Sequence, residues 1–307
     1  MRVIYGIGRL KLQKASCIAI GVFDGMHRGH QLIIKKTVAI AKKKNLVSVV
    51  VTFHPHPDTI IHTKKYSPLL MSLKHRLDSI RSFGVDVCVV VRFDARFRER
   101  NARDFVSDIL IRRCHMKDLV INRMFAFGKY KEGGEQFLKA IAKEMPFTLH
   151  FQKVLRYCGK IISSTLIRSL VMRGQLKCAV SLLGREIEVV GTVVGGDRRG
   201  RKLGFPTANI DPHHEVIPLR GVYLIQAIVG GRILAGLANI GSRPTFTKAQ
   251  KEIIELHLLN FKRNIYGKDI RVIFKKRLRD EMQFRHEALL IEQIRKDIQS
   301  ARSYFSL

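Results

Sequence analysis

Two histidines three residues apart, His27 and His30, lie in a glycine-rich segment near the start of the chain, which reads G-V-F-D-G-M-H-R-G-H over residues 21–30. The segment follows a short apolar run and precedes a helical pattern. A turn between a strand and a helix presents free backbone N–H groups and the positive end of the helix dipole, which attract phosphate. Gly25 and Gly29 let a phosphate approach the backbone, and the imidazoles can donate hydrogen bonds as charge develops on it. The segment therefore predicts a phosphate-binding turn, distinct from a P-loop because no G-K-[ST] follows.

Two other interpretations of this histidine pair stay open. The pair could ligate zinc, although Gly29 inside it suits a rigid helical site poorly and no third ligand has a telling spacing. The glycines could also serve only a tight turn. A second pair, His54 and His56, follows an apolar run; it could bind metal, but loop residues that line the carboxyl edge of the sheet are the favoured interpretation.

A second motif, I-S-S-T-L-I-R over residues 162–168, lies far downstream. Its small hydroxyl residues, Ser163, Ser164 and Thr165, can cap a helix and also hold a phosphate, and Arg168 offers a bidentate guanidinium one turn later. Alone the motif indicates only a helix cap. Together with the histidine turn it resembles the nucleotidyltransferase superfamily, which transfers an adenylyl or cytidylyl group and releases pyrophosphate. The resemblance does not indicate which molecule accepts the transferred nucleotidyl group.

The second half of the chain carries a long glycine- and arginine-rich segment, G-T-V-V-G-G-D-R-R-G-R-K-L-G-F-P-T-A-N-I over residues 191–210. Such loops suit close passage of a nucleotide phosphate chain. Thr207 and Asn209 offer neutral oxygen atoms of the kind that Mg²⁺ accepts beside phosphates and water. The alternative is a β-hairpin with a solvated basic tip.

One acidic residue downstream, Glu255, sits in the alternating segment I-I-E-L-H of residues 253–257. Alternation places it on the strand face opposite Ile254 and Leu256. A carboxylate there can take a proton from an attacking hydroxyl group, as phosphoryl transfer requires. The alternative is an ordinary solvated strand face.

The elements that must position these residues change character along the chain. Up to about residue 184, apolar runs alternate with helical patterns, which predicts a doubly wound α/β domain with a parallel sheet. The expected strands cover residues 17–20, 47–53, 86–93 and 119–121, and the expected helices cover 31–44, 73–83 and 104–113.

After that point the chain consists of short strands separated by glycine-rich turns, over residues 186–194, 221–229, 233–239, 253–260 and 270–276. A terminal helix follows, with Leu290, Ile291, Ile294 and Ile298 on one face. This pattern predicts a small antiparallel β-barrel with one helix. We therefore expect two domains, residues 1–184 and 185–307.

Composition excludes several classes of protein. Of the 307 residues, 46% are hydrophobic and 26% charged, which excludes a mostly disordered chain. No apolar run approaches the roughly 18–20 residues of a membrane span, and the first residues lack the apolar core of a signal peptide. The five cysteines form no C-x-x-C pair, which indicates neither a disulfide framework nor a zinc knuckle. A soluble cytoplasmic protein is expected, monomeric or weakly homo-oligomeric.

The net charge is +31, from 56 Lys and Arg against 25 Asp and Glu. A nucleic-acid-binding protein would show such an excess. The basic residues are spread along the whole chain, however, without an RNP-type motif or a Cys/His finger. We expect solvated surface or genomic bias, no membrane partner and no specific nucleic-acid partner beyond incidental polyanion binding; RNA binding on an old enzyme scaffold stays open as an alternative.

Residues 191–210 closely resemble the riboflavin kinase motif that ends in G-F-P-T-A-N-I, and residues 221–223, 239–246, 255–257, 266–268 and 278–281 continue the match. With the histidine turn, residues 15–300 or so are similar to the prokaryotic bifunctional riboflavin kinase/FMN adenylyltransferase (FAD synthetase) family. The resemblance implies ATP-dependent, Mg²⁺-requiring phosphorylation of riboflavin to FMN, then adenylylation of FMN to FAD with release of pyrophosphate. It makes another acceptor, such as glycerol phosphate, improbable.

The resemblance also implies roles for individual residues. In the kinase half, Thr207 and Asn209 hold the metal and ATP, Glu255 is the base, and Arg279 and Glu281 bind flavin. The ATP contacts there are Gly195, Gly200, Arg201, Gly204 and Pro206. In the transferase half His27, His30 and Arg168 are catalytic, and the ATP or phosphate contacts are Gly21, Phe23, Asp24, Gly25, Gly29, Ser163, Ser164 and Thr165.

The chain departs from the family pattern at two places. Residues 121–128 read I-N-R-M-F-A-F-G where the family has V-G-x-[DN]-F-x-F-G, so Asn122 replaces a glycine and Met124 a polar residue of the adenylyl-transfer site. A buried partner left unpaired by Met124 costs about 1–3 kcal/mol. Asn260 stands where an aspartate is common. A monofunctional riboflavin kinase with an impaired adenylyltransferase domain is therefore the alternative.

Overall fold

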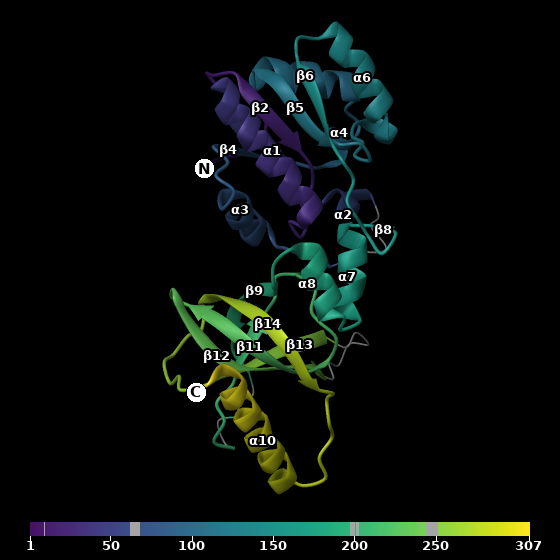
Figure 1. Ribbon diagram of the computed structural model, residues 1–307. Coiled ribbons are helices and arrows are strands. Elements are labelled where there is room, and N and C mark those ends of the chain that lie inside the picture. The colour runs from purple at the N-terminus through teal and green to yellow at the C-terminus, as the bar shows by residue number, and fades with distance from the viewer. Residues whose placement is uncertain (9, 62–67, 197–199, 201–202, 244–250) are drawn as a thin grey trace. The chain divides into compact units, whose positions relative to one another are not determined.

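The computed structural model describes residues 1–8, 10–61, 68–196, 200, 203–243 and 251–307, which form two compact units (Figure 1). The first unit contains Met1–Pro68 and Leu73–Ser164. The second contains Leu69–Ser72 and Thr165–Leu307. The four residues before Leu73 therefore belong to a unit whose other members lie almost a hundred residues downstream.

A parallel sheet of six strands forms the centre of the first unit, in the order β1-β4-β3-β2-β5-β6. The strands are β1 (Arg2–Tyr5), β2 (Ser16–Ile20), β3 (Val47–His54), β4 (Val87–Arg92), β5 (Met116–Asn122) and β6 (Thr148–Gln152). Strands β2 to β5 are almost fully buried, as their continuous apolar runs require. The predicted parallel α/β domain is confirmed.

The helices of this unit are α1 (Arg28–Lys44), α2 (Pro57–Ile61), α3 (Leu73–Arg81), α4 (Ala95–Arg98), α5 (Ala102–Asp104), η1 (Phe105–Arg113), η2 (Lys129–Lys131) and α6 (Glu135–Glu144). Helix α1 contacts β2, β3 and β5 and runs beside β2 in Figure 1. The expected helix over 104–113 is mostly a π-helix, η1, whose apolar residues pack in one cluster with the strands. A short hairpin, β7 (Arg156–Tyr157) and β8 (Lys160–Ile161), follows β6.

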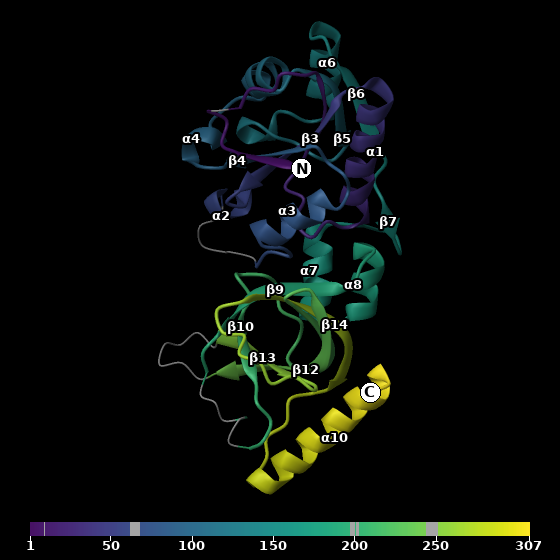
Figure 2. The ribbon, with the colours of Figure 1, turned by 90° about the vertical axis from the view of Figure 1, so that its left-hand side faces the viewer.

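The second unit is a closed antiparallel barrel in the order β10-β13-β12-β11-β14-β9, visible end-on in Figure 2. Its strands are β9 (Ile187–Val194), β10 (Ala208–Asp211), β11 (Gly221–Val229), β12 (Arg232–Arg243), β13 (Lys251–Leu258) and β14 (Asp269–Arg279). Closure leaves no free sheet edge. The predicted barrel with a terminal helix, α10 (Glu287–Phe305), is confirmed.

Two helices, α7 (Ser164–Met172) and α8 (Leu176–Leu183), connect the hairpin to the barrel. Apart from Ser164 they belong to the second unit. The change of pattern near residue 184 therefore marks the start of the barrel strands, whereas the compact units divide after Ser164. Helix α8 ends at Gly184, which adopts the left-handed conformation typical of a helix C-cap.

Side chains on the two faces of the barrel strands have different neighbours. Ile254 and Leu256 of β13 are buried. On the outside, Leu237 of β12 forms a cluster with Ala301 of α10, which holds this helix against the outer barrel surface. The N-terminal half of the helix lines a cavity, through residues such as Leu290 and Ile294.

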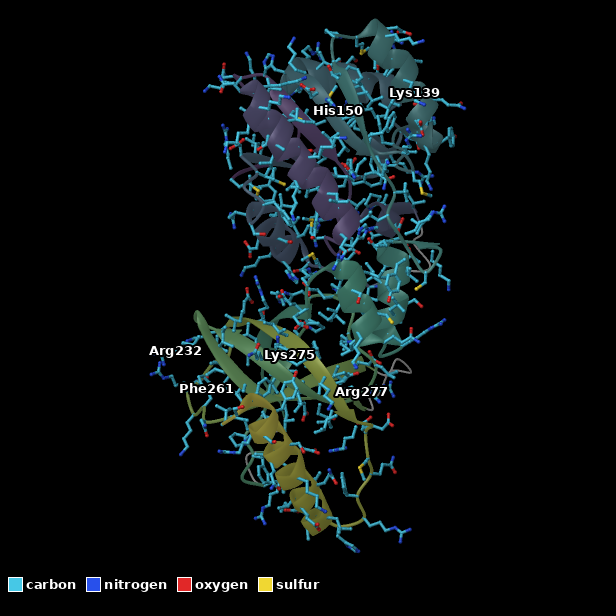
Figure 3. The ribbon with its side chains drawn as sticks, viewed as in Figure 1. Lys139, His150, Arg232, Phe261, Lys275 and Arg277 are labelled. Carbon is cyan, nitrogen blue, oxygen red and sulfur yellow. The ribbon has the colours of Figure 1, made fainter. Side chains whose placement is uncertain are left out.

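Basic side chains project from both units (Figure 3). Several are paired with carboxylates: Lys139 with Glu135 at 2.7 Å, Lys275 with Glu186 at 3.2 Å, and Arg277 with Asp280; the His150 imidazole lies 2.6 Å from Asp118 Oδ1. The excess of positive charge is thus distributed over both units. Among the described residues, no helix combines the length and the apolar character needed to cross a membrane.

Candidate active sites

The turn that carries the first histidine pair connects β2, which ends at Ile20, to α1, which begins at Arg28. Strand β2 lies between β3 and β5, so the chain proceeds from β2 to one side of the sheet and later returns to the other side. The carboxyl edge of a parallel sheet forms a crevice where the strand order reverses in this way, and ligands of open α/β sheets bind there. The sheet order therefore places residues 21–30 at the expected binding edge.

Backbone conformation shapes this turn. Phe23, Gly25 and Met26 all have positive φ, at 55°, 80° and 43°. A Cβ atom on Gly21 would lie 3.0 Å from the Phe23 ring, and one on Gly29 would lie 3.2 Å from the His27 ring. The predicted approach of phosphate to Gly29 stays a prediction; in the structure the absence of a side chain at Gly29 also leaves room for the His27 imidazole.

The two imidazoles stack on each other, with ring centroids 3.6 Å apart and planes 22° apart. His27 is the N-cap of α1, and its Nδ1 accepts a hydrogen bond from the backbone N–H of His30 at 3.4 Å. Because Nδ1 accepts, the proton of neutral His27 resides on Nε2, which can donate to a ligand.

Burial controls the charge of both histidines. It lowers the pKa of His27 to about 4. The pKa of His30 is lowered by burial, with further contributions from His27 and from the guanidinium of Arg76. Both side chains are therefore neutral hydrogen-bond donors near pH 7, and an incoming anion would favour their protonation.

The zinc interpretation of the pair has little support from this geometry. The rings stack instead of directing nitrogens to a common point. Within the described ranges, no group of three or more His, Cys, Asp or Glu residues could hold a metal ion. His54 ends β3 at the carboxyl edge of the sheet, and His56 Nδ1 accepts the Asp58 N–H at 3.1 Å.

The serine motif touches this turn directly. Ser164 Oγ donates to the backbone oxygen of Asp24 at 2.8 Å, and Asp24 is 2% exposed. Ser163 and Ser164 belong to the first unit, whereas Thr165 and Arg168 belong to the second. Helix α7 begins at Ser164, as the helix-cap interpretation of the motif predicts.

A buried arginine that the sequence analysis missed lies under the turn. Arg76 of α3 is 3% exposed. Its Nη1 donates to the Val22 oxygen at 2.6 Å and its Nη2 to the Phe53 oxygen at 3.0 Å. It therefore connects the carboxyl ends of β2 and β3. One arginine in a chain with 56 basic residues carries no sequence signal of this role.

An apolar cavity of about 450 Å³ opens at the same edge of the sheet. Aromatic rings dominate its lining, from the ends of β3 and β4, from α4 and η1, and from the loop after β5: Phe53, Phe93, Phe97, Phe105, Phe125 and Phe127. Such rings suit a flat aromatic ligand. The sequence analysis missed this cavity, although it singled out residues 121–128 for another reason.

The departure at residue 124 has a local structural account. Asn122 Oδ1 accepts the Met124 N–H at 2.9 Å, which shapes the turn after β5. The Met124 side chain is 62% exposed.

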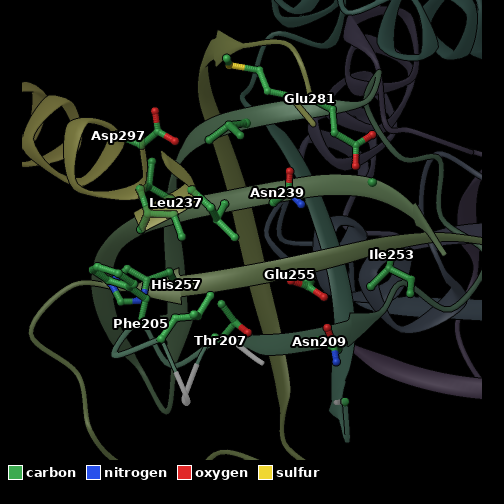
Figure 4. Close-up of a pocket in the computed structure, with 18 of the residues that line it drawn as sticks. Phe205, Thr207, Asn209, Leu237, Asn239, Ile253, Glu255, His257, Glu281 and Asp297 are labelled. Carbon is green, nitrogen blue, oxygen red and sulfur yellow. The ribbon is translucent and has the colours of Figure 1, made fainter. Parts of the chain in front are cut away.

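The second site is a cavity of about 720 Å³ on the outer surface of the barrel (Figure 4). Three side chains from adjacent strands line it: Asn209 of β10 is opposite Glu255 of β13, and Glu255 is opposite Asn239 of β12. Opposite residues of antiparallel strands point to the same face. Glu255 thus faces the cavity while Ile254 and Leu256 are buried, as the alternation predicts.

The side-chain amide of Asn209 packs closely against Gly196. A Cβ atom on Gly196 would overlap the Asn209 amide, so only glycine fits there. Asn209 Oδ1 is buried and has no hydrogen-bond partner among the described residues. Buried polar atoms nearly always have a hydrogen-bond partner, so this oxygen is a candidate contact for a bound ligand.

The loop before β10 contains most of the other predicted nucleotide contacts. A Cβ on Gly200 would collide with the Phe205 oxygen and lie 3.1 Å from Thr207 Oγ1. Gly204 has a positive φ of 86°. His257 Nδ1 donates to the Pro206 oxygen at 3.0 Å. Gly195 precedes this segment, and Arg201 lies outside the described residues.

The predicted flavin residues lie beside α10 and β12. Arg279 forms an ion pair with Asp297 of α10, with Nη2 2.7 Å from Oδ2, and Gln293 Nε2 donates to Asp297 Oδ1 at 2.9 Å. Asp297 is 4% exposed and was missed by the sequence analysis. A Cβ on Gly241 would collide with the carboxylate of Glu281. Both predicted residues line the cavity.

Comparison with known proteins covers both units. The sequence matches a family model described as FAD synthetase over residues 10–166 and one described as riboflavin kinase over residues 183–305. A protein of Escherichia coli (strain K12) described as bifunctional riboflavin kinase/FMN adenylyltransferase is 36% identical over 310 residues, covering 100% of this chain and 99% of its own. Proteins with the same description are 34% identical in Buchnera aphidicola subsp. Schizaphis graminum (100% of both chains) and 36% identical in Bacillus subtilis (strain 168; 96% and 94%).

A solved structure from Streptococcus pneumoniae, described as a macrolide-efflux protein, is also similar. It superimposes with a TM-score of 0.86 at 26% identity and covers 98% of this chain and 99% of its own. The likeness concerns the fold, and it extends over both the sheet unit and the barrel unit.

Proposed function

The chain belongs to the bifunctional riboflavin kinase/FMN adenylyltransferase family, and we propose that one of its two active sites lies in the parallel-sheet domain and the other in the barrel. The enzyme phosphorylates riboflavin to FMN and adenylylates FMN to FAD. Because both family models match and the bifunctional relatives are similar over the full chain, a monofunctional kinase is disfavoured. As a functional division, residues 1–184 carry adenylyl transfer and residues 185–307 carry the kinase.

The kinase site is the cavity on the barrel. This assignment rests on the position of three side chains, since Asn209, Glu255 and Asn239 lie opposite one another on adjacent strands and face the cavity. Glu255 accepts the proton of the riboflavin ribityl hydroxyl as its oxygen attacks the γ-phosphorus of ATP, and ADP leaves. The ATP phosphates lie along the glycine-rich loop, against Gly195, Gly200, Arg201, Gly204 and Pro206. The proposed base lies beside the residues that would hold the ATP phosphates, and this proximity supports direct in-line transfer of the phosphoryl group.

Mg²⁺ fits the residues on this wall. Asn209 presents a buried oxygen without a partner among the described residues, and Thr207 presents a hydroxyl two residues earlier, directly before the strand begins. Neutral oxygens combined with phosphate oxygens and water suit Mg²⁺. When bound, the ion would offset the charge of the ATP phosphates.

The flavin side of the cavity suits an uncharged substrate. Arg279 is neutralised by Asp297, so it offers N–H groups and a planar guanidinium surface instead of a free charge. Leu237, Leu290 and Ile294 supply apolar surface nearby. Riboflavin carries no phosphate, and Arg279 and Glu281 can contact its ring and its polar edge.

Adenylyl transfer takes place at the histidine turn. The FMN phosphate oxygen attacks the α-phosphorus of ATP, the bond to the β-phosphate oxygen breaks, and pyrophosphate leaves. His27 and His30 donate to the oxygens on which charge develops. ATP contacts Gly21, Phe23, Asp24, Gly25 and Gly29, and its phosphates are gripped by Ser163, Ser164, Thr165 and Arg168. The aromatic cavity beside the turn takes the flavin ring.

The remaining assignments concern the cell. The five cysteines are free thiols, which supports a cytoplasmic location. Riboflavin, FMN and ATP are the small-molecule partners, and the protein acts as a monomer or weak homo-oligomer. Anionic nucleotides partly account for the basic surface, with polyanion binding incidental and salt-sensitive.

A product assay tests both assignments in one experiment. Purified protein is incubated with riboflavin, ATP and Mg²⁺, and FMN and FAD are separated by chromatography. We expect FMN followed by FAD in the wild type, and FMN alone in His27→Ala. FMN alone in the wild type would refute adenylyl transfer, and neither product from folded protein would refute both activities.

A further inference from the structure

Strands β2 and β3 of the parallel sheet separate where the histidine turn begins. Their paired residues end with Ile20 opposite Val51, and a backbone hydrogen bond from the Gly21 N–H to the Val51 oxygen follows at 3.1 Å. Backbone oxygens beyond such a point need other donors, because buried carbonyl groups are almost always paired. Side chains supply these donors here.

Arg76 of α3 donates to both strand ends at once. Its Nη1 donates to the Val22 oxygen at 2.6 Å and its Nη2 to the Phe53 oxygen at 3.0 Å. A guanidinium holds its donors in a rigid planar fork, so it fixes the spacing of the two oxygens as well as their distance from α3. Thr52 Oγ1 donates to the same Val22 oxygen at 2.9 Å. The Val22 oxygen therefore keeps one donor when Arg76 is changed.

The guanidinium is buried together with its charge. Arg76 is 3% exposed, and its Nε has no hydrogen-bond partner among the described residues. Burial lowers the pKa of His54 at the end of β3, and the nearby Arg76 guanidinium lowers it further. Burying an ionised group is costly unless hydrogen bonds compensate. A helix that only had to pack against the sheet would bury an apolar side chain at this position.

Both oxygens belong to residues that line the aromatic cavity. Val22 lies in the histidine turn, and the ring centroid of Phe53 lies 6.1 Å from those of Phe93 and Phe97, which line the same cavity. Arg76 is not itself one of the described residues that line it. It therefore acts on the shape of the cavity through the backbone of two residues that do.

From these contacts we infer that Arg76 is a positioning residue for FMN in adenylyl transfer. By fixing the backbone at Val22 and Phe53, it holds one wall of the cavity in the shape that accepts the flavin ring. The inference rests on the proposed adenylyl transfer at the histidine turn, and all three residues belong to the first unit. Misplacement by about 1 Å at an active site lowers rates by up to about a hundredfold, so loss of the fork suffices.

The competing interpretation is that Arg76 only stabilises the first unit. Steady-state kinetics of the full-length protein separate the two, with supplied FMN and ATP varied in turn. Arg76→Lys keeps the charge but removes the planar fork, whereas Arg76→Gln removes both. The matched control is Arg81→Lys on the same helix, because Arg81 is half exposed and its Nη1 lies 2.6 Å from Asp78 Oδ1.

We expect both Arg76 variants to raise KM for FMN about tenfold, because the displaced wall belongs to the flavin cavity. KM for ATP should change by less than about threefold, since Thr52 still holds the Val22 oxygen in the turn. Arg81→Lys should leave both KM values within about twofold of the wild type. Riboflavin phosphorylation, measured in the same preparations, should also stay within about twofold, because it takes place in the barrel.

A second variant tests the shared contact. Thr52→Val removes the other donor to the Val22 oxygen at nearly constant volume, and alone it should change KM for ATP by less than about threefold. In the Arg76→Lys background the Val22 oxygen loses both neighbours that hold it in the wild type, so KM for ATP should then rise about tenfold. Equal effects of Thr52→Val in the two backgrounds would contradict joint positioning of Val22.

KM does not depend on the fraction of active molecules, so partial unfolding lowers the apparent kcat alone. A fall in kcat with KM for FMN unchanged in both Arg76 variants would overturn the positioning role. If Arg76→Gln does not fold, Arg76→Lys carries the same test, because it keeps the charge and the helix propensity of the wild type. Absence of FAD from the wild type would instead contradict the proposed function itself, so the two failures are distinguishable.

Discussion

Asn209 and Glu255 lie directly opposite each other on the antiparallel strands β10 and β13, facing the cavity on the outer surface of the barrel. Glu255 is at the same time opposite Asn239 on the next strand. The pairing brings a carboxylate beside a buried amide oxygen that has no partner in the described part of the chain. A carboxylate and two amide side chains thus share one face of three adjacent strands.

Replacing the proposed base should affect one activity only. Glu255→Gln keeps the size of the side chain but removes its basicity, so kcat of riboflavin phosphorylation should fall by about 10²–10⁴-fold. Adenylylation of supplied FMN should stay unchanged, since it takes place in the other unit. Glu252→Gln on the same strand, where Glu252 pairs with Arg220 at 3.4 Å, is the control. Chromatography of both products measures the effect; a loss below about fivefold would exclude the base role.

Asn209→Leu should separate stability from activity. The change removes a buried oxygen that lacks a partner among the described residues, so the free energy of unfolding should stay equal or rise by about 1 kcal/mol. Riboflavin phosphorylation should fall at least about tenfold and require more Mg²⁺ for half-maximal rate. Urea unfolding and a Mg²⁺ titration of the kinase rate measure the two effects. An unaltered Mg²⁺ dependence would contradict the metal-ligand assignment.

Gly29→Ala should displace an imidazole without destabilising the fold. The new Cβ would lie 3.2 Å from Cε1 and Nδ1 of His27, so the ring must shift by a few tenths of an ångström. Alanine favours a helix over glycine by about 1 kcal/mol, which offsets the strain. We expect adenylylation to fall about tenfold and the free energy of unfolding to change by less than about 1 kcal/mol.

The control for this variant is Gly8→Ala, because a Cβ at Gly8 meets no described atom within 4 Å. FAD formation from FMN is measured for both variants. Equal activity of Gly29→Ala and the wild type would show that the His27 ring position is not critical.

Stability should depend on pH through His27. Its folded pKa is about 4 against an ordinary 6.5, so the unfolded state binds more protons between these values. The free energy of unfolding therefore rises as the pH increases from about 4 to 6.5. The contribution of His27 is fully present above pH 6.5, is lost as the pH falls toward 4, and amounts to about 3 kcal/mol in total. His27→Asn should flatten this dependence.

The measurement is urea unfolding at several pH values without nucleotide, followed by circular dichroism. His115→Asn is the control, since His115 is exposed and asparagine tolerates its positive φ of 49°. The same slope in His27→Asn and in the wild type would contradict a buried neutral imidazole. His30 should retain part of the slope, because burial lowers its pKa in the same direction.

Sequence patterns were reliable where one element buries one continuous surface. The apolar runs at 47–53 and 86–93 predicted β3 and β4 almost to the residue, since strands buried on both faces must be apolar throughout. Strands β1 and β6 escaped prediction because they form the edges of the sheet and are half exposed. Strand β10 escaped because it is short and carries the polar Asn209.

The residues of the two candidate sites also divide into those that local sequence predicts and those that depend on distant contacts. Local sequence predicted the histidine turn, the start of α7 near Ser164 and the outward face of Glu255, because each depends on neighbours only a few residues away. Arg76 and Asp297 were missed because their roles come from burial against segments that lie 54 and 18 residues away in the chain. The packing of the His27 ring against Gly29 was also missed, because it depends on how the turn folds.

The order of residues along the chain was enough to predict the two fold classes, their order and the family, because apolar periodicity and long motifs are local features of the sequence. The folded structure was needed to show that Leu69–Ser72 belong to the barrel unit, which side chains face each cavity and which buried groups hold them. These properties arise from contacts between residues far apart in sequence, such as Ser72 and Glu215, and no local pattern encodes the partner that a buried polar group will find.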